Sequence, residues 1–128
     1  MRKTVAIDLD GVLASQSTPW TGVEDFGDPI SGSVEFTKTI SQFADIVIHT
    51  ARCNTELNRG YSIPLIRNMV KNWLDENGFI YHDIWIGEGK PIAAAYVDDR
   101  AVTCRPEENE DAYQTAAHLA KLLCGVPL

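Results

Sequence analysis

The stretch that decides the fold is Thr4-Val5-Ala6-Ile7-Asp8-Leu9-Asp10-Gly11-Val12, a hydrophobic run that ends in two carboxylates and a glycine. Such a run predicts a buried strand whose last side chains emerge at the edge of the sheet. Because strand side chains alternate, we expect Asp8 and Asp10 to share one face while Leu9 points to the other. Two negative charges so close repel each other unless a cation, a shared proton or backbone N–H groups lie between them. The Asp10-Gly11 pair is also typical of a turn.

Length and composition restrict the class of protein. The chain has 128 residues, 45% hydrophobic and 23% charged, which predicts one soluble globular domain over residues 1–128. The formal net charge of -7 argues against a nucleic-acid partner, since nucleic-acid-binding domains present a basic face. The three cysteines form no C-x-x-C pair, so we expect free thiols and a cytoplasmic location. The hydrophobic run near the N-terminus is too short for a signal peptide or a membrane span, so no membrane partner is expected.

Strand and helix patterns alternate along the rest of the chain. A flap of about residues 12–30, with Trp20 and Phe26 as its aromatics, precedes the first predicted helix. This helix runs from the N-cap candidate Ser33 to Phe43, with Phe36, Ile40 and Phe43 on one apolar stripe. Further helices are predicted over 58–77 and over 107–123, and Pro64 either lies in the first turn of the former or breaks a short lead-in to it. Further strands are predicted over 45–50, 83–87 and 94–98. This alternation favours an α/β protein, with a three-layer α/β/α Rossmann-like fold and a mostly parallel central sheet.

Polar side chains follow each predicted strand, and parallel sheets bind ligands beyond the carboxyl ends of their strands. The residues in these positions are Asp8, Asp10, Thr50, Lys90, Asp98 and Asp99. Converging carboxylates with a single lysine suit a hard divalent cation, above all Mg²⁺, and an anion that bridges the metal and the lysine. The pattern therefore predicts a phosphate site.

These motifs, in this order, resemble the four motifs of the haloacid dehalogenase (HAD) superfamily of phosphohydrolases. The matching segments are Asp8-Leu9-Asp10-Gly11-Val12, Ile46-Val47-Ile48-His49-Thr50, Lys90-Pro91 and Tyr96-Val97-Asp98-Asp99-Arg100, so the resemblance spans residues 4–100. Singly, each motif has an ordinary structural interpretation: a turn, a strand end, a solvated loop or a helix N-cap. The resemblance rests on the occurrence of all four motifs together, in this order.

The resemblance assigns the four carboxylates distinct roles. Asp8 would be the nucleophile that forms an aspartyl-phosphate, and Asp10 would be the general acid and base. Mg²⁺ would be held by Asp8, the backbone carbonyl of Asp10 and one or both of Asp98 and Asp99. Neighbouring negative charge would help Asp10 to carry the proton that its first step requires.

The remaining site residues would bind the phosphoryl group. The resemblance implies that Lys90, the Thr50 hydroxyl and N–H groups near Gly11 contact the phosphoryl oxygens. Arg52 follows the second predicted strand and is a candidate for substrate binding, although a solvated loop residue is the commoner case. The catalytic set is thus Asp8, Asp10, Thr50 and Lys90.

The sequence leaves no room for the cap domain that many members of this superfamily carry, so it resembles a minimal, capless member. An open site suits the exposed phosphate of a large substrate, or a neighbouring subunit of a homo-oligomer that acts as a lid. The acidic surface disfavours polynucleotide ends and favours a sugar phosphate or a nucleotide as the substrate. One alternative is a receiver-like signalling domain, but receivers place their acidic pair first and the phosphorylated aspartate later. Another is a relative that binds phosphate without turnover.

Overall fold

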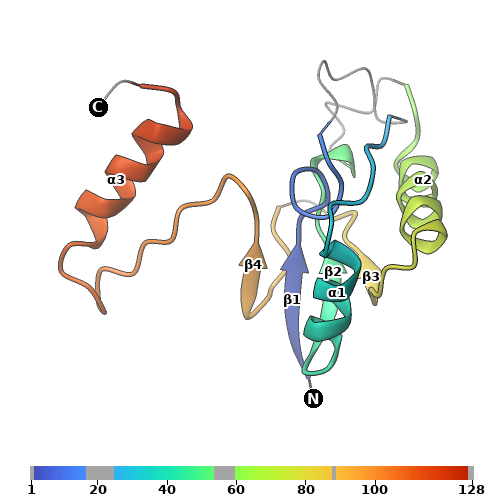
Figure 1. The fold of residues 1–128 in the computed structure, drawn as a ribbon, viewed down its shortest axis with the longest axis horizontal. Coiled ribbons are helices and arrows are strands. Elements are labelled where there is room, and N and C mark those ends of the chain that lie inside the picture. Colours follow the sequence, from blue (N-terminus) through green and yellow to red (C-terminus); the bar gives the residue numbers. More distant parts are fainter. Residues whose placement is uncertain (1, 17–24, 54–59, 88, 127–128) are drawn as a thin grey trace. The chain divides into compact units, whose positions relative to one another are not determined.

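The structure is a computed structural model that describes residues 2–16, 25–53, 60–87 and 89–126. The chain divides into two compact units, Met1–Asp98 and Asp99–Leu128, which we describe separately. Among the described residues, the first unit contains the whole sheet, two α-helices and a short 3-10 helix, and the second contains one α-helix (Figure 1). The single domain expected over 1–128 stays a prediction.

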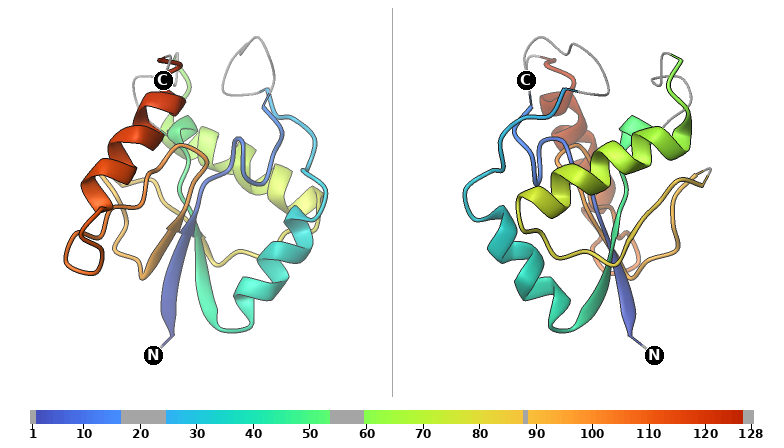
Figure 2. Two further views of the ribbon diagram at one scale, coloured as in Figure 1. Left: turned by 60° about the vertical axis from the view of Figure 1, so that its left-hand side comes forward. Right: turned by 90° about the vertical axis from the view of Figure 1, so that its right-hand side faces the viewer.

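A four-stranded parallel sheet forms the centre of the first unit. Its strands are β1 (Lys3–Ile7), β2 (Ala44–Ile48), β3 (Asp83–Ile84) and β4 (Ala95–Val97), in the order β3-β2-β1-β4. In the register, Val5 of β1 lies opposite Ile46 of β2 and Ala95 of β4. In the left view of Figure 2, β1 (blue) lies between β4 (orange) and β2 (green). The α/β class and the parallel sheet are therefore confirmed.

The apolar sequences of β1 and β2 explain why these two strands lie in the centre of the sheet. Val5, Ala6 and Ile7 are all buried, as expected of a parallel strand covered on both faces. In β2, Ile46 and Ile48 are completely buried. The third strand is shorter than the sequence predicts, because its pairing with β2 ends at Ile84.

The helix α1 (Ser33–Ser41) differs from its prediction at both ends. Its N-cap is Gly32, with a φ of 87° that glycine adopts without strain, so the assignment of Ser33 as N-cap is wrong. Ser33 is instead the first helical residue and is buried. The helix ends before Phe43, which is 61% exposed, whereas Phe36 and Ile40 pack against the core as expected.

The helix α2 (Ile63–Glu76) has clear sequence signals at both ends. The Ser62 side chain caps it by accepting a hydrogen bond from the backbone N–H of Leu65, and Pro64 lies in the first turn, which is one of its two predicted positions. Asn77 closes the helix, and Gly78 follows with a φ of 78°. The predicted start at residue 58 lies outside the described residues, and the helix begins only after Ser62.

The core of the first unit lies between the sheet and these helices. It consists of the buried residues Val5, Ile7, Leu9, Leu13, Ala14, Ala44, Ile46, Ile48, Val70, Trp73, Leu74, Phe79 and Ile84. Within it Trp73 stacks on Phe26 at 5.9 Å and on Phe79 at 5.2 Å between ring centroids. The returning end of the predicted flap is thus packed against α2.

The second unit contains α3 (Ala112–Leu123), which starts five residues later than the predicted position 107 because residues 107–111 form turns. Gly125 follows its end with a φ of 72°. Among the described residues, no helix has the length and apolar character that crossing a membrane requires.

Candidate active site

The first carboxylate of the site stands where β1 ends. The backbone N–H of Asp8 donates to the Val97 carbonyl at 3.0 Å, which continues the pairing of β1 with β4 by one residue. One carboxylate oxygen of Asp8 accepts a hydrogen bond from the N–H of Leu9 at 2.8 Å. Asp8 is therefore fixed at the carboxyl edge of the two strands and half-buried.

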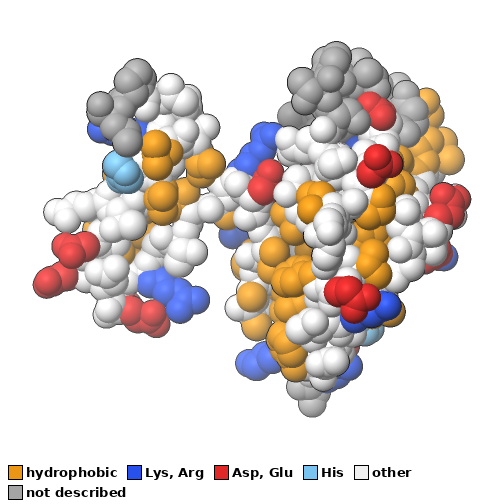
Figure 3. Space-filling model, viewed as in Figure 1, with side chains coloured by type: hydrophobic (Ala, Val, Ile, Leu, Met, Phe, Trp, Pro, Cys, Tyr) orange, Lys and Arg blue, Asp and Glu red, His pale blue; other side chains and the backbone are white. Residues whose placement is uncertain are grey.

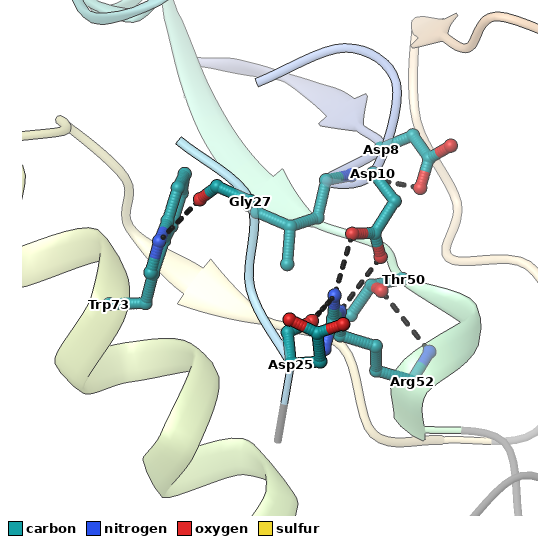
Figure 4. Close-up of polar contacts among 8 residues, drawn as sticks. Asp8, Asp10, Asp25, Gly27, Thr50, Arg52 and Trp73 are labelled. Carbon is teal, nitrogen blue, oxygen red and sulfur yellow. Dashed lines mark hydrogen bonds and ion pairs between the residues drawn. The ribbon is translucent and has the colours of Figure 1, made fainter. Parts of the chain in front are cut away.

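The chain turns immediately after Asp8. The Leu9 carbonyl accepts hydrogen bonds from the N–H groups of Val12, Leu13 and Ala14, and β1 itself ends at Ile7. The turn interpretation of Asp10 and Gly11 is thus correct, and the strand does not extend to Asp10. In Figure 4 the Asp8 and Asp10 carboxylates point in different directions.

Three carboxylates converge at the edge of the sheet. One carboxylate oxygen from each of Asp8, Asp98 and Asp99 lies within 4.8 Å of the others. Asp98 follows β4 directly, and Asp99 is joined to it by a peptide bond. Clustered carboxylate oxygens are the ligands that Mg²⁺ prefers, so the residues present suit such an ion.

The Asp10 carboxylate belongs to a different cluster, in which its partner is Arg52. The Arg52 Nε donates to Oδ2 of Asp10 and Nη2 donates to Oδ1, both at 2.8 Å (Figure 4). The Arg52 side chain is 2% exposed and that of Asp10 is 21% exposed. A positive charge therefore contacts Asp10, where the sequence interpretation expects negative neighbours.

Thr50 links this pair to the sheet. It is buried just beyond the end of β2, and its Oγ1 accepts a hydrogen bond from the Arg52 N–H at 3.2 Å. The short 3-10 helix η1 (Ala51–Cys53) begins there, and it turns the Arg52 side chain toward Asp10. The structure thus brings Asp10, Thr50 and Arg52 together.

Two other predicted residues have different contacts here. Gly11, with a φ of 85°, donates its N–H to the Ala14 carbonyl at 2.8 Å and so closes the turn. Lys90 is exposed, and its Nζ lies 4.5 Å from the centroid of the Tyr96 ring. The roles of Gly11 and Lys90 at a phosphoryl group stay predictions.

Sequence reasoning missed the part that the flap return plays. The Asp25 carbonyl accepts a hydrogen bond from Arg52, and Phe26 lies under the Arg52 guanidinium. The aromatic character of Phe26 was a signal for such a contact, but its partner could not be read from sequence. Trp20, the other flap aromatic, lies outside the described residues.

Cys53 is close to the site but is not suited to act as a nucleophile. Burial raises the pKa of its thiol above the usual value, and the charge of Arg67 offsets this rise only in part. A raised pKa disfavours the thiolate, which is the reactive form.

Comparison with known proteins supports the fold. No family model matches the sequence, and no curated protein matches it. Among solved structures, the chain is similar to a conserved protein from Bacteroides thetaiotaomicron, with a TM-score of 0.54 and 17% identity over 98% of this chain and 92% of that one. This likeness shows that a bacterial protein of similar length shares the fold.

Two further solved structures are more distant in shape. One is a D,D-heptose 1,7-bisphosphate phosphatase from B. bronchiseptica, complexed with magnesium and phosphate, with a TM-score of 0.45 and 18% identity over 91% of this chain and 63% of that one. The other is a protein from Vibrio cholerae, with a TM-score of 0.47 and 27% identity over 91% of this chain and 98% of that one.

Proposed function

We propose that this chain is a Mg²⁺-dependent phosphohydrolase of the haloacid dehalogenase type, which hydrolyses phosphate monoesters through an aspartyl-phosphate on Asp8. The observation that carries the proposal is the convergence of Asp8 with Asp98 and Asp99 within 4.8 Å at the carboxyl edge of the sheet. A second carboxylate, Asp10, stands two residues after Asp8 on an adjoining turn. This arrangement supports separate roles for the two aspartates.

In the first step, an Asp8 carboxylate oxygen attacks phosphorus, and the bond from phosphorus to the ester oxygen breaks. Asp10 gives its proton to the departing alkoxide, so the alcohol leaves neutral. In the second step, Asp10 takes a proton from water as the water oxygen attacks the same phosphorus. The acyl phosphate bond breaks, which releases inorganic phosphate and restores Asp8. When bound, Mg²⁺ supplies the positive charge that offsets repulsion between carboxylate and phosphate.

The phosphoryl oxygens need further donors as negative charge moves onto them. The buried Thr50 hydroxyl lies at the end of β2, beside the Asp10 cluster, and fits such a role. Lys90 has to leave the Tyr96 ring to reach a phosphoryl group, which its exposed position permits. A cation on an aromatic face at an exposed site is held by only about 0.5–1 kcal/mol.

The proposed substrate is a phosphorylated small molecule such as a sugar phosphate or a nucleotide, and the proposed location is the cytoplasm. Repulsion from an acidic protein, with a net charge of -7, disfavours a polynucleotide. On the face shown in Figure 3, the described acidic and basic side chains of the first unit are interspersed and form no continuous basic patch. A homo-oligomer, with one subunit covering the site of another, stays part of the proposal.

The test is phosphate release from a panel of phosphate monoesters by the purified protein with Mg²⁺. We expect catalytic release that is abolished by a chelator and by Asp8→Asn. The matched control is Glu35→Gln, which also converts a carboxylate to an amide but on the exposed surface of α1, where Glu35 pairs with Lys38. It should keep wild-type activity.

Other outcomes separate the alternatives. One stable phosphoryl group per chain after treatment with acetyl phosphate, without turnover, would indicate a receiver-like switch. Binding of inorganic phosphate without any hydrolysis would indicate a relative that has lost turnover. Hydrolysis that survives Asp8→Asn would exclude Asp8 as the nucleophile.

A further inference from the structure

Arg52 is the largest side chain that the structure buries completely, although arginine is rarely buried without partners. Its Nε and Nη2 donate to the two oxygens of Asp10, and Nη2 also donates to the carbonyl of Asp25 at 2.5 Å (Figure 4). A paired, bidentate geometry of this kind fixes the plane of the carboxylate as well as its distance. Arg52 therefore determines where the Asp10 carboxylate points.

The same guanidinium also supports the segment that returns from the flap. Its Cζ lies 4.1 Å from the centroid of the Phe26 ring, which stacks in turn on Trp73 of α2. The Trp73 Nε1 donates to the Gly27 carbonyl at 3.2 Å. Residues 25–27 are thus attached to α2 through Trp73 and to Asp10 through Arg52.

We propose that Arg52 is a positioning residue, which holds the Asp10 carboxylate for proton transfer and couples it to the flap return, and that it is not a ligand of the substrate phosphate. This inference rests on the proposed function, because it concerns the aspartate that serves there as acid and base. The burial of Arg52 and the direction of its donors toward protein acceptors support it. Proton transfer is sensitive to geometry, since a displacement of about 1 Å can cost 10²-fold in rate.

The role predicts a dependence on the leaving group. A para-nitrophenolate leaves readily without a proton, whereas the alkoxide of a primary alkyl phosphate needs one from Asp10. The ratio kcat/KM covers the steps up to departure of the leaving group, so it isolates this proton transfer from the later attack of water. Lysine at position 52 keeps the charge but loses the planar fork that binds both oxygens.

The experiment measures kcat/KM for para-nitrophenyl phosphate and for a primary alkyl phosphate in the Arg52→Gln, Arg52→Lys and Phe26→Leu variants. We expect Arg52→Gln to lower the value for the alkyl ester by about tenfold or more beyond its effect on the aryl ester. Arg52→Lys and Phe26→Leu should show the same pattern with a smaller difference. The inhibition constant for inorganic phosphate should stay unchanged in all three. Arg2→Gln is the control, because Arg2 pairs with Asp45 at the opposite end of β1 from Asp8.

Two results would overturn the positioning role. Equal losses of kcat/KM for both esters in every variant would show that Arg52 has only a structural role. A tenfold or larger rise in the inhibition constant for phosphate would show that Arg52 binds the substrate. If the wild-type protein hydrolyses neither ester, the proposed function is wrong and the role in proton transfer falls with it. In that case, urea unfolding still tests whether the pair forms. If Arg52 contacts Asp10, the changes in unfolding midpoint of Arg52→Gln and Asp10→Asn do not add up to the change in the double variant.

Discussion

At the scale of single residues, Tyr81 gives a prediction that does not depend on function. Its hydroxyl donates to Asp75 Oδ1 at 2.7 Å, and burial, followed by this hydrogen bond, raises the pKa of Tyr81 to about 12. The folded protein therefore holds this proton more tightly than the unfolded chain, whose tyrosines have a pKa of about 10. The stability that Tyr81 contributes is complete below pH 10 and is lost as the pH rises toward 12.

The measurement is an ultraviolet titration of tyrosine ionisation in the wild-type protein and in Tyr81→Phe, whose difference isolates this group. We expect Asp75→Asn to move the titration to lower pH, because it removes the negative acceptor, while Glu76→Gln leaves it in place. A titration of Tyr81 that Asp75→Asn does not shift would show that the hydrogen bond is absent in solution.

The sequence predicted which residues lie at the site where their spacing relative to the strands decides it. It did not predict contacts between residues that are far apart in the chain. The positions of Asp8 and Asp98 at the ends of predicted strands were enough to predict carboxylates at one sheet edge, since parallel strands end together. The pairing of Arg52 with Asp10 joins residues 42 positions apart and has no sequence pattern. This pairing depends on η1, which turns the Arg52 side chain toward Asp10.

At the scale of secondary-structure elements, the N-terminus of α2 gives a stability prediction. The exposed Ser62 accepts a hydrogen bond from the Leu65 N–H at 3.2 Å, one of the N–H groups that the helix itself leaves without an acceptor. Ser62→Ala should lower the free energy of unfolding by about 1 kcal/mol, and Ser62→Asp should retain it.

Urea unfolding monitored by circular dichroism checks this prediction. Asn68→Ala, an exposed substitution inside the same helix, is the control and should not destabilise the protein, because alanine has the higher helix propensity. If Ser62→Ala and Ser62→Asp have equal stabilities, the cap contributes nothing.

Element types followed from periodicity, but their bounds depended on tertiary pairing. The predicted end of α2 at residue 77 agrees with the structure, in which Asn77 and Gly78 close the helix, but the predicted start at residue 58 precedes the Ser62 cap. The strand predicted over 83–87 shortens to Asp83–Ile84, since a strand lasts only as long as its neighbour pairs with it. Phe43 fits a helical stripe in sequence, yet the helix ends two residues before it.

At the scale of the whole molecule, the parallel direction of the strands agrees with general rules of connection. Each pair of neighbouring strands is parallel, so the chain must cross over between them, and α1 supplies the crossover from β1 to β2. This arrangement was predictable from the alternation of strands and helices. It brings the residues after β1 and β4 to one edge, although these strands are separated by most of the first unit in sequence.

Binding of Mg²⁺ at that edge should stabilise the whole fold, because the cluster of Asp8, Asp98 and Asp99 exists only when β1 and β4 are paired. A ligand that binds only the folded state stabilises it by about 2.7 kcal/mol at a concentration of 100 times its Kd. The thermal unfolding midpoint should therefore rise with Mg²⁺ concentration and return to its starting value when a chelator is added. Asp98→Asn should reduce this rise, and Glu35→Gln on α1 should not. An equal rise in both variants would show that Mg²⁺ acts elsewhere on the acidic surface, and the carboxylate cluster would then not be its site.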